Sequence, residues 1–254
     1  MIDIHNHILP NVDDGPKNKD EALQLLIQAA EQGIKGIVAS PHHLHTNYSN
    51  NFKDIELMVS KFNNIPEVKD LNIEIYPGQE LRISDQILKD LDDEKICGIN
   101  HSNYLLLELP SNGVPHYTQR LLYEIQTKGY IPIIVHPERN KAISKDINQL
   151  FKLVNIGALS QITASSLTGD LGRNIQNLSI KMIEHNLVHF IASDAHDVKK
   201  RPFSLGHITN NPNLKNIEKN IQLFLSNNEA MVQNKKIAFS RPIEYQKKKF
   251  LGLF

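Results

Sequence analysis

The first fifteen residues, MIDIHNHILPNVDDG, concentrate side chains that can bind metal ions. His5 and His7 close a short apolar run, and Asp13 and Asp14 follow in a turn-like segment. On a β-strand, residues two apart share a face, so both imidazoles would project together. Imidazole and carboxylate together suit Mn, Fe or Zn, but a His-x-His pair or an Asp-Asp turn alone is more often structural. A metal site therefore requires partners elsewhere in the chain.

Side chains of the same chemistry follow or end most of the other apolar runs. They are His42 and His43 after GIVAS, Glu80 in PGQE, Glu108 in LLLELP, His136 in IIVHP, and Asp194 and His196 in ASDAH. Singly, each has a structural alternative, such as a core histidine at 136 or a helix N-cap at 194. A carboxylate inside an apolar run needs a cationic or metal partner, however. If the runs are parallel strands, all these residues gather at the carboxyl ends.

The elements that must position these residues alternate along the chain. Short β-rich runs are separated by segments with helical periodicity, ending at glycines such as Gly33, Gly129 and Gly157. The predicted strands are 1–5, 36–40, 72–76, 104–109, 131–136, 159–163 and 188–193, and the predicted helices are 19–32, 51–63, 115–128, 146–156 and 172–186. In helix 19–32, the spacing of Leu23, Leu26, Ile27 and Ala30 predicts the buried face.

This alternation predicts a parallel α/β fold, a (β/α) barrel in one domain of residues 1–254, with an open doubly wound sheet as the alternative. The barrel would occupy about 1–235 and a basic-aromatic tail 236–254. The end of that tail, YQKKKFLGLF, is interpreted as a packed terminal segment in preference to a contact surface.

Composition excludes several classes of protein. Lys and Arg number 28, as do Asp and Glu, so the formal net charge is zero and a nucleic-acid partner is not favoured. The chain shows neither a secretory leader nor an apolar run long enough to span a membrane, so we expect a cytoplasmic protein. Its single cysteine, Cys97, precludes an internal disulfide framework. Cys97 is followed by GINHSN, which lacks the arginine of a cysteine-dependent phosphatase loop.

Six motifs taken together resemble the PHP (polymerase and histidinol phosphatase) superfamily. They are HNH (5–7), SPHH (40–43), PGQE (77–80), LLLELP (105–110), VHPERN (135–140) and ASDAH (192–196). Within it they resemble the CpsB/CapC/YwqE group of bacterial manganese-dependent protein-tyrosine phosphatases. The resemblance implies a distorted (β/α)7 barrel with three Mn²⁺ ions, for which Fe or Zn could substitute. It implies one ion on His5, His7, Glu80 and Asp194, a second on Glu80, Glu108 and His136, and a third on Asp14, His42 and His196.

The resemblance also implies the reaction. A hydroxide bridging the metals would attack phosphorus, Arg139 and Arg201 would hold the phosphate, and His43 is a candidate proton donor. The implied substrate is the phosphotyrosine tail of a bacterial tyrosine autokinase that regulates capsule or exopolysaccharide assembly. Lys199 and Lys200, beside Arg201, are interpreted as solvated charges. Two alternatives stay open: a small-molecule phosphoesterase of the histidinol-phosphate type, and a non-catalytic, metal-dependent regulator that binds the kinase.

Overall fold

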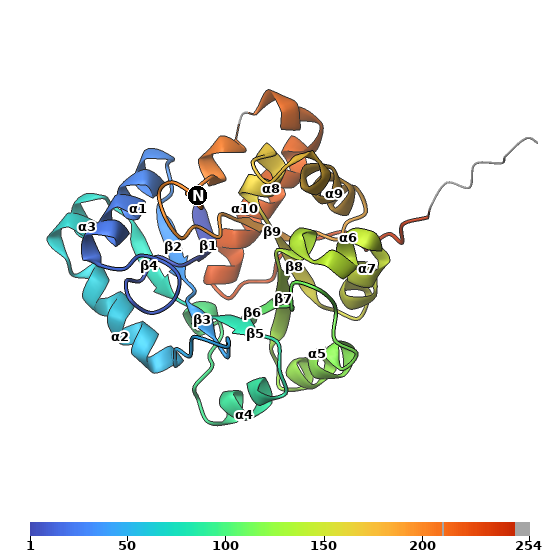
Figure 1. Ribbon diagram of the computed structural model, residues 1–254, viewed down its shortest axis with the longest axis horizontal. Helices are drawn as coiled ribbons and strands as arrows, with labels where there is room; N and C mark the ends of the chain where they lie inside the picture. Colours follow the sequence, from blue (N-terminus) through green and yellow to red (C-terminus); the bar gives the residue numbers. More distant parts are fainter. Residues whose placement is uncertain (210, 247–254) are drawn as a thin grey trace, which may run out of the picture.

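A computed structural model describes residues 1–209 and 211–246 of the chain. Its strands all pair in parallel and lie at the centre of the molecule (Figure 1). One sheet has the order β1 (Ile2–Asn6), β2 (Gly36–Ala39), β4 (Glu74–Pro77). The other has the order β3 (His42–His43), β5 (Glu80–Arg82), β6 (Tyr104–Glu108), β7 (Ile131–Val135), β8 (Leu159–Thr163), β9 (Phe190–Ala192).

The two sheets join into a closed barrel. β2 and β3 are halves of one strand interrupted at Ser40 and Pro41, and proline cannot donate a hydrogen bond to a sheet. β4 and β5 are halves of another, interrupted at Gly78 and Gln79. A parallel bridge from Asn6 to Ala195 connects β1 with the end of β9. Seven interrupted or continuous strands therefore enclose the centre, which confirms the distorted (β/α)7 barrel and rules out the open sheet.

Helices surround the barrel (Figure 1). The five predicted helices form within a few residues of their expected bounds, as α1 (Lys19–Glu31), α2 (Phe52–Asn63), α5 (Thr118–Thr127), α7 (Asn148–Asn155) and α9 (Arg173–Glu184). Four shorter helices were not predicted, namely α3 (Pro66–Asp70), α4 (Gln86–Asp92), α6 (Lys141–Lys145) and α8 (Ala164–Thr168). They have five to seven residues each, too few for a clear helical period.

The first helix shows both the success and the error of periodicity. Asn18 caps it by accepting a hydrogen bond from the backbone N–H of Glu21 (2.9 Å), as the N-cap rule predicts. The buried face, however, is formed by Ala22, Leu25, Leu26 and Ala29. Ile27, which we placed on the core face, is 45% exposed. The prediction of the buried face was therefore wrong by about one residue of helical rotation.

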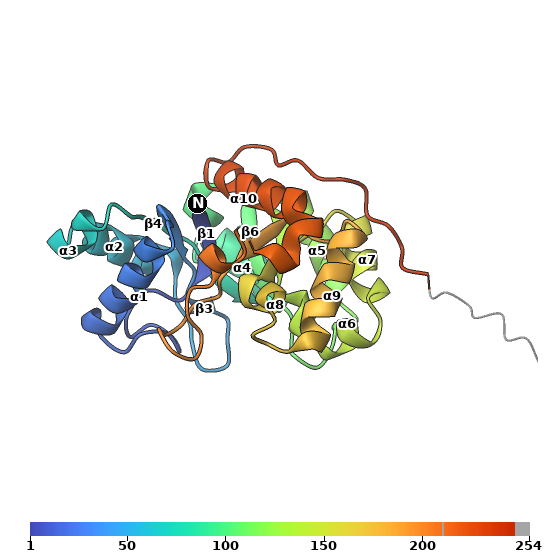
Figure 2. The same ribbon diagram turned by 90° about the horizontal axis from the view of Figure 1, so that it is seen from above.

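An unpredicted helix, α10 (Glu218–Val232), covers the barrel end at which the strands begin (Figure 2). Met231 and Val232 join the apolar cluster inside the barrel. The buried Asn228 amide donates to the carbonyls of Ile2 (3.0 Å) and Ile191 (2.7 Å), at the first and last strands. The helix thus closes this end with both apolar packing and amide hydrogen bonds, and leaves the opposite end for a site.

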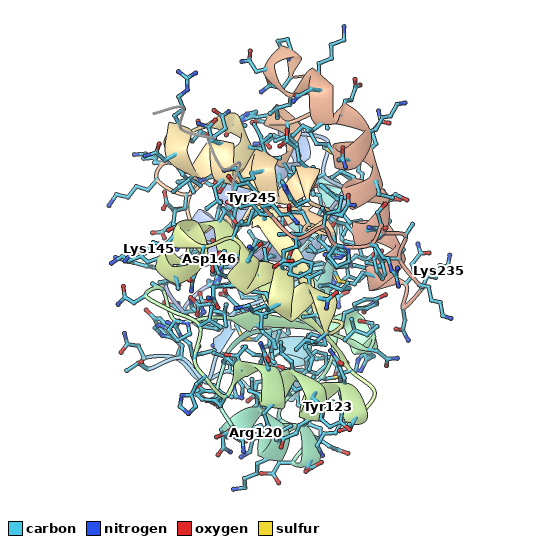
Figure 3. All side chains as sticks on the ribbon, turned by 90° about the vertical axis from the view of Figure 1, so that its right-hand side faces the viewer. Arg120, Tyr123, Lys145, Asp146, Lys235 and Tyr245 are labelled. Carbon is cyan, nitrogen blue, oxygen red and sulfur yellow. The ribbon has the colours of Figure 1, made fainter. Side chains whose placement is uncertain are left out.

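The chain after α10 runs across the outside of the barrel (Figure 2). Ile243 donates its backbone N–H to the carbonyl of His185, and Tyr245 exchanges two hydrogen bonds with the Asn148 side chain. Lys181 lies 4.6 Å from the ring centroid of Tyr245, labelled in Figure 3. Residues 236–246 therefore contact the barrel at Ile243 and Tyr245 although most of them are exposed, and most of YQKKKFLGLF lies outside the described residues. Among the described helices, none has the length and apolarity needed to cross a bilayer.

Acid is expected to destabilise the fold through His189, just before β9. Burial lowers the pKa of His189 to about 4, and its Nδ1 accepts a hydrogen bond from the backbone N–H of Ser160 (3.1 Å). In the unfolded chain this imidazole binds its proton with a pKa near 6.5. Between pH 6.5 and 4 the unfolded state therefore holds more protons than the folded state, and the fold loses stability as the pH is lowered. Protonation of His189 should lower the free energy of unfolding by an amount on the order of 3 kcal/mol once the pH is below 4.

Urea unfolding of the wild type and His189→Asn between pH 7 and 4 checks this expectation. The asparagine amide can still accept from Ser160 but does not titrate, so its stability should fall less steeply with acid. The exposed His207 provides the matched control, because His207→Asn should keep the wild-type slope. Parallel slopes for His189→Asn and the wild type would contradict the assignment.

Candidate metal centre

The nine candidate metal ligands lie together at the carboxyl end of the barrel. They come from the ends of strands or the loops that follow them, as His5 on β1, His7 and Asp14 after it, His42 on β3, Glu80 on β5, Glu108 on β6, His136 after β7, and Asp194 and His196 after β9. His136 (φ 34°) and Asp194 (φ 55°) adopt left-handed backbone conformations that are uncommon outside glycine. The chain turns sharply at both, so each candidate ligand lies one or two residues beyond the end of its strand.

Glu80 is the centre of the cluster. Its Oε2 lies 3.4 Å from His5 Nε2, 3.3 Å from His7 Nε2 and 2.9 Å from His42 Nδ1. Its Oε1 lies 2.8 Å from His136 Nε2. Burial opposes ionisation of Glu80, but the surrounding histidines hold its pKa well below its usual range. One carboxylate therefore faces four imidazoles, an arrangement that suits a bridging ligand.

Two more aspartates complete the cluster on either side. Asp14 Oδ1 lies 3.5 Å from His42 Nε2 and 3.3 Å from His196 Nε2. Asp194 Oδ1 lies 3.5 Å from His7 Nε2 and 3.7 Å from His5 Nε2. Asp14 is also more exposed than the buried Asp194. Asp14 therefore lies at the open side of the cluster, and Asp194 lies within it.

Several polar atoms in the cluster have no hydrogen bond, although they are buried. Among the described residues, no hydrogen-bond partner exists for Nε2 of His5, His7 and His196, nor for Oε2 of Glu80. Leaving such atoms unsatisfied costs roughly 1–3 kcal/mol each. They lie in a shared space in which more than one cation could bind them. The donor set, with imidazoles and carboxylates but no thiolate, fits Mn²⁺, Fe²⁺ or Zn²⁺.

Three overlapping groups bring their ligand atoms within 4.8 Å of one another, and each could hold a cation. They are His7, Asp14, His42 and His196; His5, His7 and Glu80; and His42, Glu80 and Glu108. His7, His42 and Glu80 each belong to two groups. The geometry therefore provides several adjacent cation positions with shared ligands, instead of separate sites.

Hydrogen bonds outside the cluster orient its histidines. His7 Nδ1 lies 2.5 Å from Asp13 Oδ2, and His5 Nδ1 lies 2.9 Å from Gln161 Oε1. These contacts fix the Nδ1–H tautomer and direct each Nε2 lone pair inward, as is usual for metal-binding histidines. A Cβ on Gly15 would lie 2.2 Å from the carbonyl oxygen of His7, so this glycine lets the aspartate loop approach β1. Asp13 and Gln161 were not predicted as site residues.

Two arginines stand beside the cluster. Arg139, in the short 3-10 helix Pro137–Arg139, and Arg201 both donate to Asp194 Oδ2. Burial alone would raise the pKa of Asp194, but Arg139 and the nearby histidines lower it well below its usual range. Both arginines, with Asp14, Glu80 and Glu108, line an open cavity of about 390 Å³. An oxyanion in this cavity would meet guanidinium groups and the cluster at once.

Glu108 differs from the other carboxylates. Burial and the nearby charge of Glu80 raise the pKa of its carboxyl group to about 7. Arg82, which was not predicted, lies with Nε 3.3 Å from Glu108 Oε2 and partly offsets this repulsion. A divalent cation between Glu80 and Glu108 would relieve the remaining repulsion.

The structure does not bring His43 to the cavity. Its Nε2 lies 3.1 Å from the Asp90 carboxylate of α4, and it does not line the cavity that His42 lines. The reason is the period of the strand: His42 points inward, so its neighbour on β3 points outward. The geometry therefore argues against His43 as a proton donor in this site.

A closed parallel barrel with a histidine–carboxylate cluster at its carboxyl end defines the class, a metal-binding (β/α)-barrel protein. The sequence profile described as "Capsular polysaccharide synthesis, CpsB/CapC" matches residues 1–233. The chain therefore belongs to the CpsB/CapC family.

Individual relatives agree with this assignment. The chain is 51% identical to CapC of Staphylococcus aureus and 37% identical to tyrosine-protein phosphatase YwqE of Bacillus subtilis, in both cases over all of each chain. A chain from the crystal structures of YwqE and of Streptococcus pneumoniae CpsB, described as unique metal-dependent tyrosine phosphatases, superposes with a TM-score of 0.91 at 36% identity. That match covers 97% of this chain and 100% of the other. An organophosphorus hydrolase mutant, at 13% identity and a TM-score of 0.51, shares the fold alone, covering 91% of this chain and 92% of its own.

Proposed function

We propose that this chain is a metal-dependent protein-tyrosine phosphatase acting on a kinase of the capsule or exopolysaccharide pathway. The observation that carries the proposal is the cluster of nine candidate ligands, six of which line one open cavity together with two arginines. The family relationship supports the same activity, because YwqE and CpsB bear that description. This arrangement suits a phosphomonoester, whose oxygens can meet cations and arginines together.

The nine residues could hold three Mn²⁺ ions. His5, His7, Glu80 and Asp194 would hold the first, Glu80, Glu108 and His136 the second, and Asp14, His42 and His196 the third. The short contacts from Glu80 to His5, His7 and His136 support its role as the bridge. When bound, the metals supply Lewis acidity and an activated water for attack on phosphorus.

The chain's own groups position the phosphate. Arg139 and Arg201 are fixed through Asp194 Oδ2, and their remaining N–H groups hold the non-bridging phosphate oxygens and stabilise the charge that develops there. The leaving phenol has a pKa of about 10, so it departs with less proton assistance than an alkyl alcohol. No general acid is therefore required, which agrees with the position of His43 away from the cavity.

The substrate is a phosphotyrosine in an exposed peptide, as in the tail of a bacterial tyrosine autokinase. A cavity open to solvent can admit a side chain that projects from a flexible segment. His45, which stacks on His42 with ring centroids 4.8 Å apart, and Ser111 line its walls. Such a cavity does not have to enclose the rest of the substrate, which suits a protein more than a small molecule.

The test compares substrates under one condition. With Mn²⁺ bound, we expect kcat/KM for a phosphotyrosine peptide to exceed that for histidinol phosphate by about 10²-fold or more, because only the aryl ester has a good leaving group. Steady-state phosphate release measures both rates. A preference for histidinol phosphate would favour a small-molecule phosphoesterase. Metal binding without hydrolysis of either ester would favour a regulator that binds the kinase.

A further inference from the structure

A second cavity adjoins the candidate catalytic one. It has a volume of about 220 Å³, and it shares Arg139, Asp194 and Arg201 with the larger cavity. These three residues therefore form a common wall, with the metal cluster on one side. The two cavities therefore meet at this wall.

The second cavity carries positive charge that the cluster does not use. Lys199 and Lys200 line it, and neither ammonium group has a carboxylate within ion-pair distance among the described residues. Asp197, the nearest acidic residue in sequence, instead accepts hydrogen bonds from their backbone N–H groups (2.8 and 2.6 Å). Those bonds hold the loop while leaving both lysine side chains free to meet a ligand.

Two other lining groups bear on anion binding, one favourable and one unfavourable. Ser204 is 2% exposed, and its hydroxyl oxygen has no hydrogen-bond partner among the residues described. Asp170 is an acidic group on the cavity wall, and the Thr168 hydroxyl donates to its carboxylate (2.6 Å). Because Asp194 is already matched by two arginines, the lysines leave the cavity with excess positive charge.

We propose that this second cavity is a subsite for an anionic group of the substrate, a phosphate or carboxylate a few residues from the phosphotyrosine. The inference rests on the proposed phosphatase activity and adds to it a preference for peptides with an anionic group near the phosphotyrosine. An extended peptide advances about 3.3 Å per residue, so a neighbouring side chain reaches past the shared wall. Lys199 and Lys200 bind that second anion and take no part in the chemistry.

The experiment uses the metal-loaded full chain and peptides of equal length. One peptide has neutral residues around a single phosphotyrosine, a set carries glutamate one to four residues away, and another set carries a second phosphotyrosine there. For Lys199→Gln/Lys200→Gln, kcat/KM should fall about five- to tenfold on the best flanked peptides and stay within about twofold on the neutral one. A lower kcat/KM on the glutamate peptides would show that the subsite binds a carboxylate. A lower kcat/KM only on the doubly phosphorylated peptides would show that it binds a phosphate.

Another lysine pair gives the matched control. Lys235 and Lys236 are exposed and follow α10, and Lys235 lies at the edge of the molecule away from Lys145 and α6 (Figure 3). The double substitution Lys235→Gln/Lys236→Gln removes the same charge and should leave kcat/KM unchanged for every peptide. Equal losses on neutral and flanked peptides, or no loss on any flanked peptide, would overturn the subsite. A wild type inactive on all phosphotyrosine peptides would instead refute the phosphatase proposal itself.

Discussion

Replacing Glu80 with glutamine is expected to lower kcat for phosphotyrosine peptides by about 10³-fold, equivalent to several kcal/mol of lost transition-state stabilisation. The reason lies in its position, since its two oxygens face His5, His7, His42 and His136. An amide keeps the shape but loses the charge and cannot bridge two cations. Bound metal, measured by elemental analysis, should fall below the wild-type content in parallel with kcat.

Glu138 provides a matched control for this substitution. It is another buried glutamate, but its carboxylate accepts hydrogen bonds from Thr163 and from the Ser166 hydroxyl. Glu138→Gln should lower the melting temperature and leave the metal content unchanged. If Glu80→Gln kept both its full metal content and its activity, the central carboxylate would not be the bridge.

Removing the metals is the second change with a large expected effect. Dialysis against EDTA should abolish hydrolysis and lower Tm by about 5–10 °C, because a ligand at a hundredfold excess over its Kd stabilises the fold by about 2.7 kcal/mol. Without a cation, the carboxylates of Glu80 and Glu108 also repel each other. Calorimetry and phosphate release before and after addition of Mn²⁺, Fe²⁺ or Zn²⁺ measure both effects.

EDTA saturated beforehand with Mn²⁺ is the control, because it should change neither activity nor Tm. The metal that restores the highest kcat at the lowest concentration identifies the preferred cofactor. Full activity in protein shown to contain negligible metal would exclude the proposed chemistry.

The fold was largely predictable because the strands are apolar and lie between clear helix boundaries. The interruptions at Pro41 and Gly78 were not, since the two-residue strand His42–His43 is too short to show a period. Helix α10 escaped prediction for a different reason. Its buried face includes Asn227 and Asn228, whose amides donate to the carbonyls of His189, just before β9, and Ile191, within it, so the pattern looks polar in sequence.

Within the site, residue type and position at strand ends predicted eight of the nine clustered residues, whereas Asp14, in the loop after β1, was predicted only from the family resemblance. The outer contacts were harder, because Asp13, Gln161 and Arg82 act through orientations that only the folded barrel defines. Arg82 did leave a signal, as it lies two residues after Glu80 and so on the same face of β5. The same alternation should have excluded His43, which follows the inward-facing His42.

The junction of β1 with β9 also constrains the order in which the molecule can form. Asp3 accepts hydrogen bonds from the backbone N–H of Ser193, a contact between residues 190 positions apart. His5 and His7 belong to one side of this junction, and Asp194 and His196 to the other. Pairing so distant in sequence is slow and late in folding. During synthesis, the metal-binding cluster can therefore form in full only after most of the chain has left the ribosome, although His5 and His7 are made first.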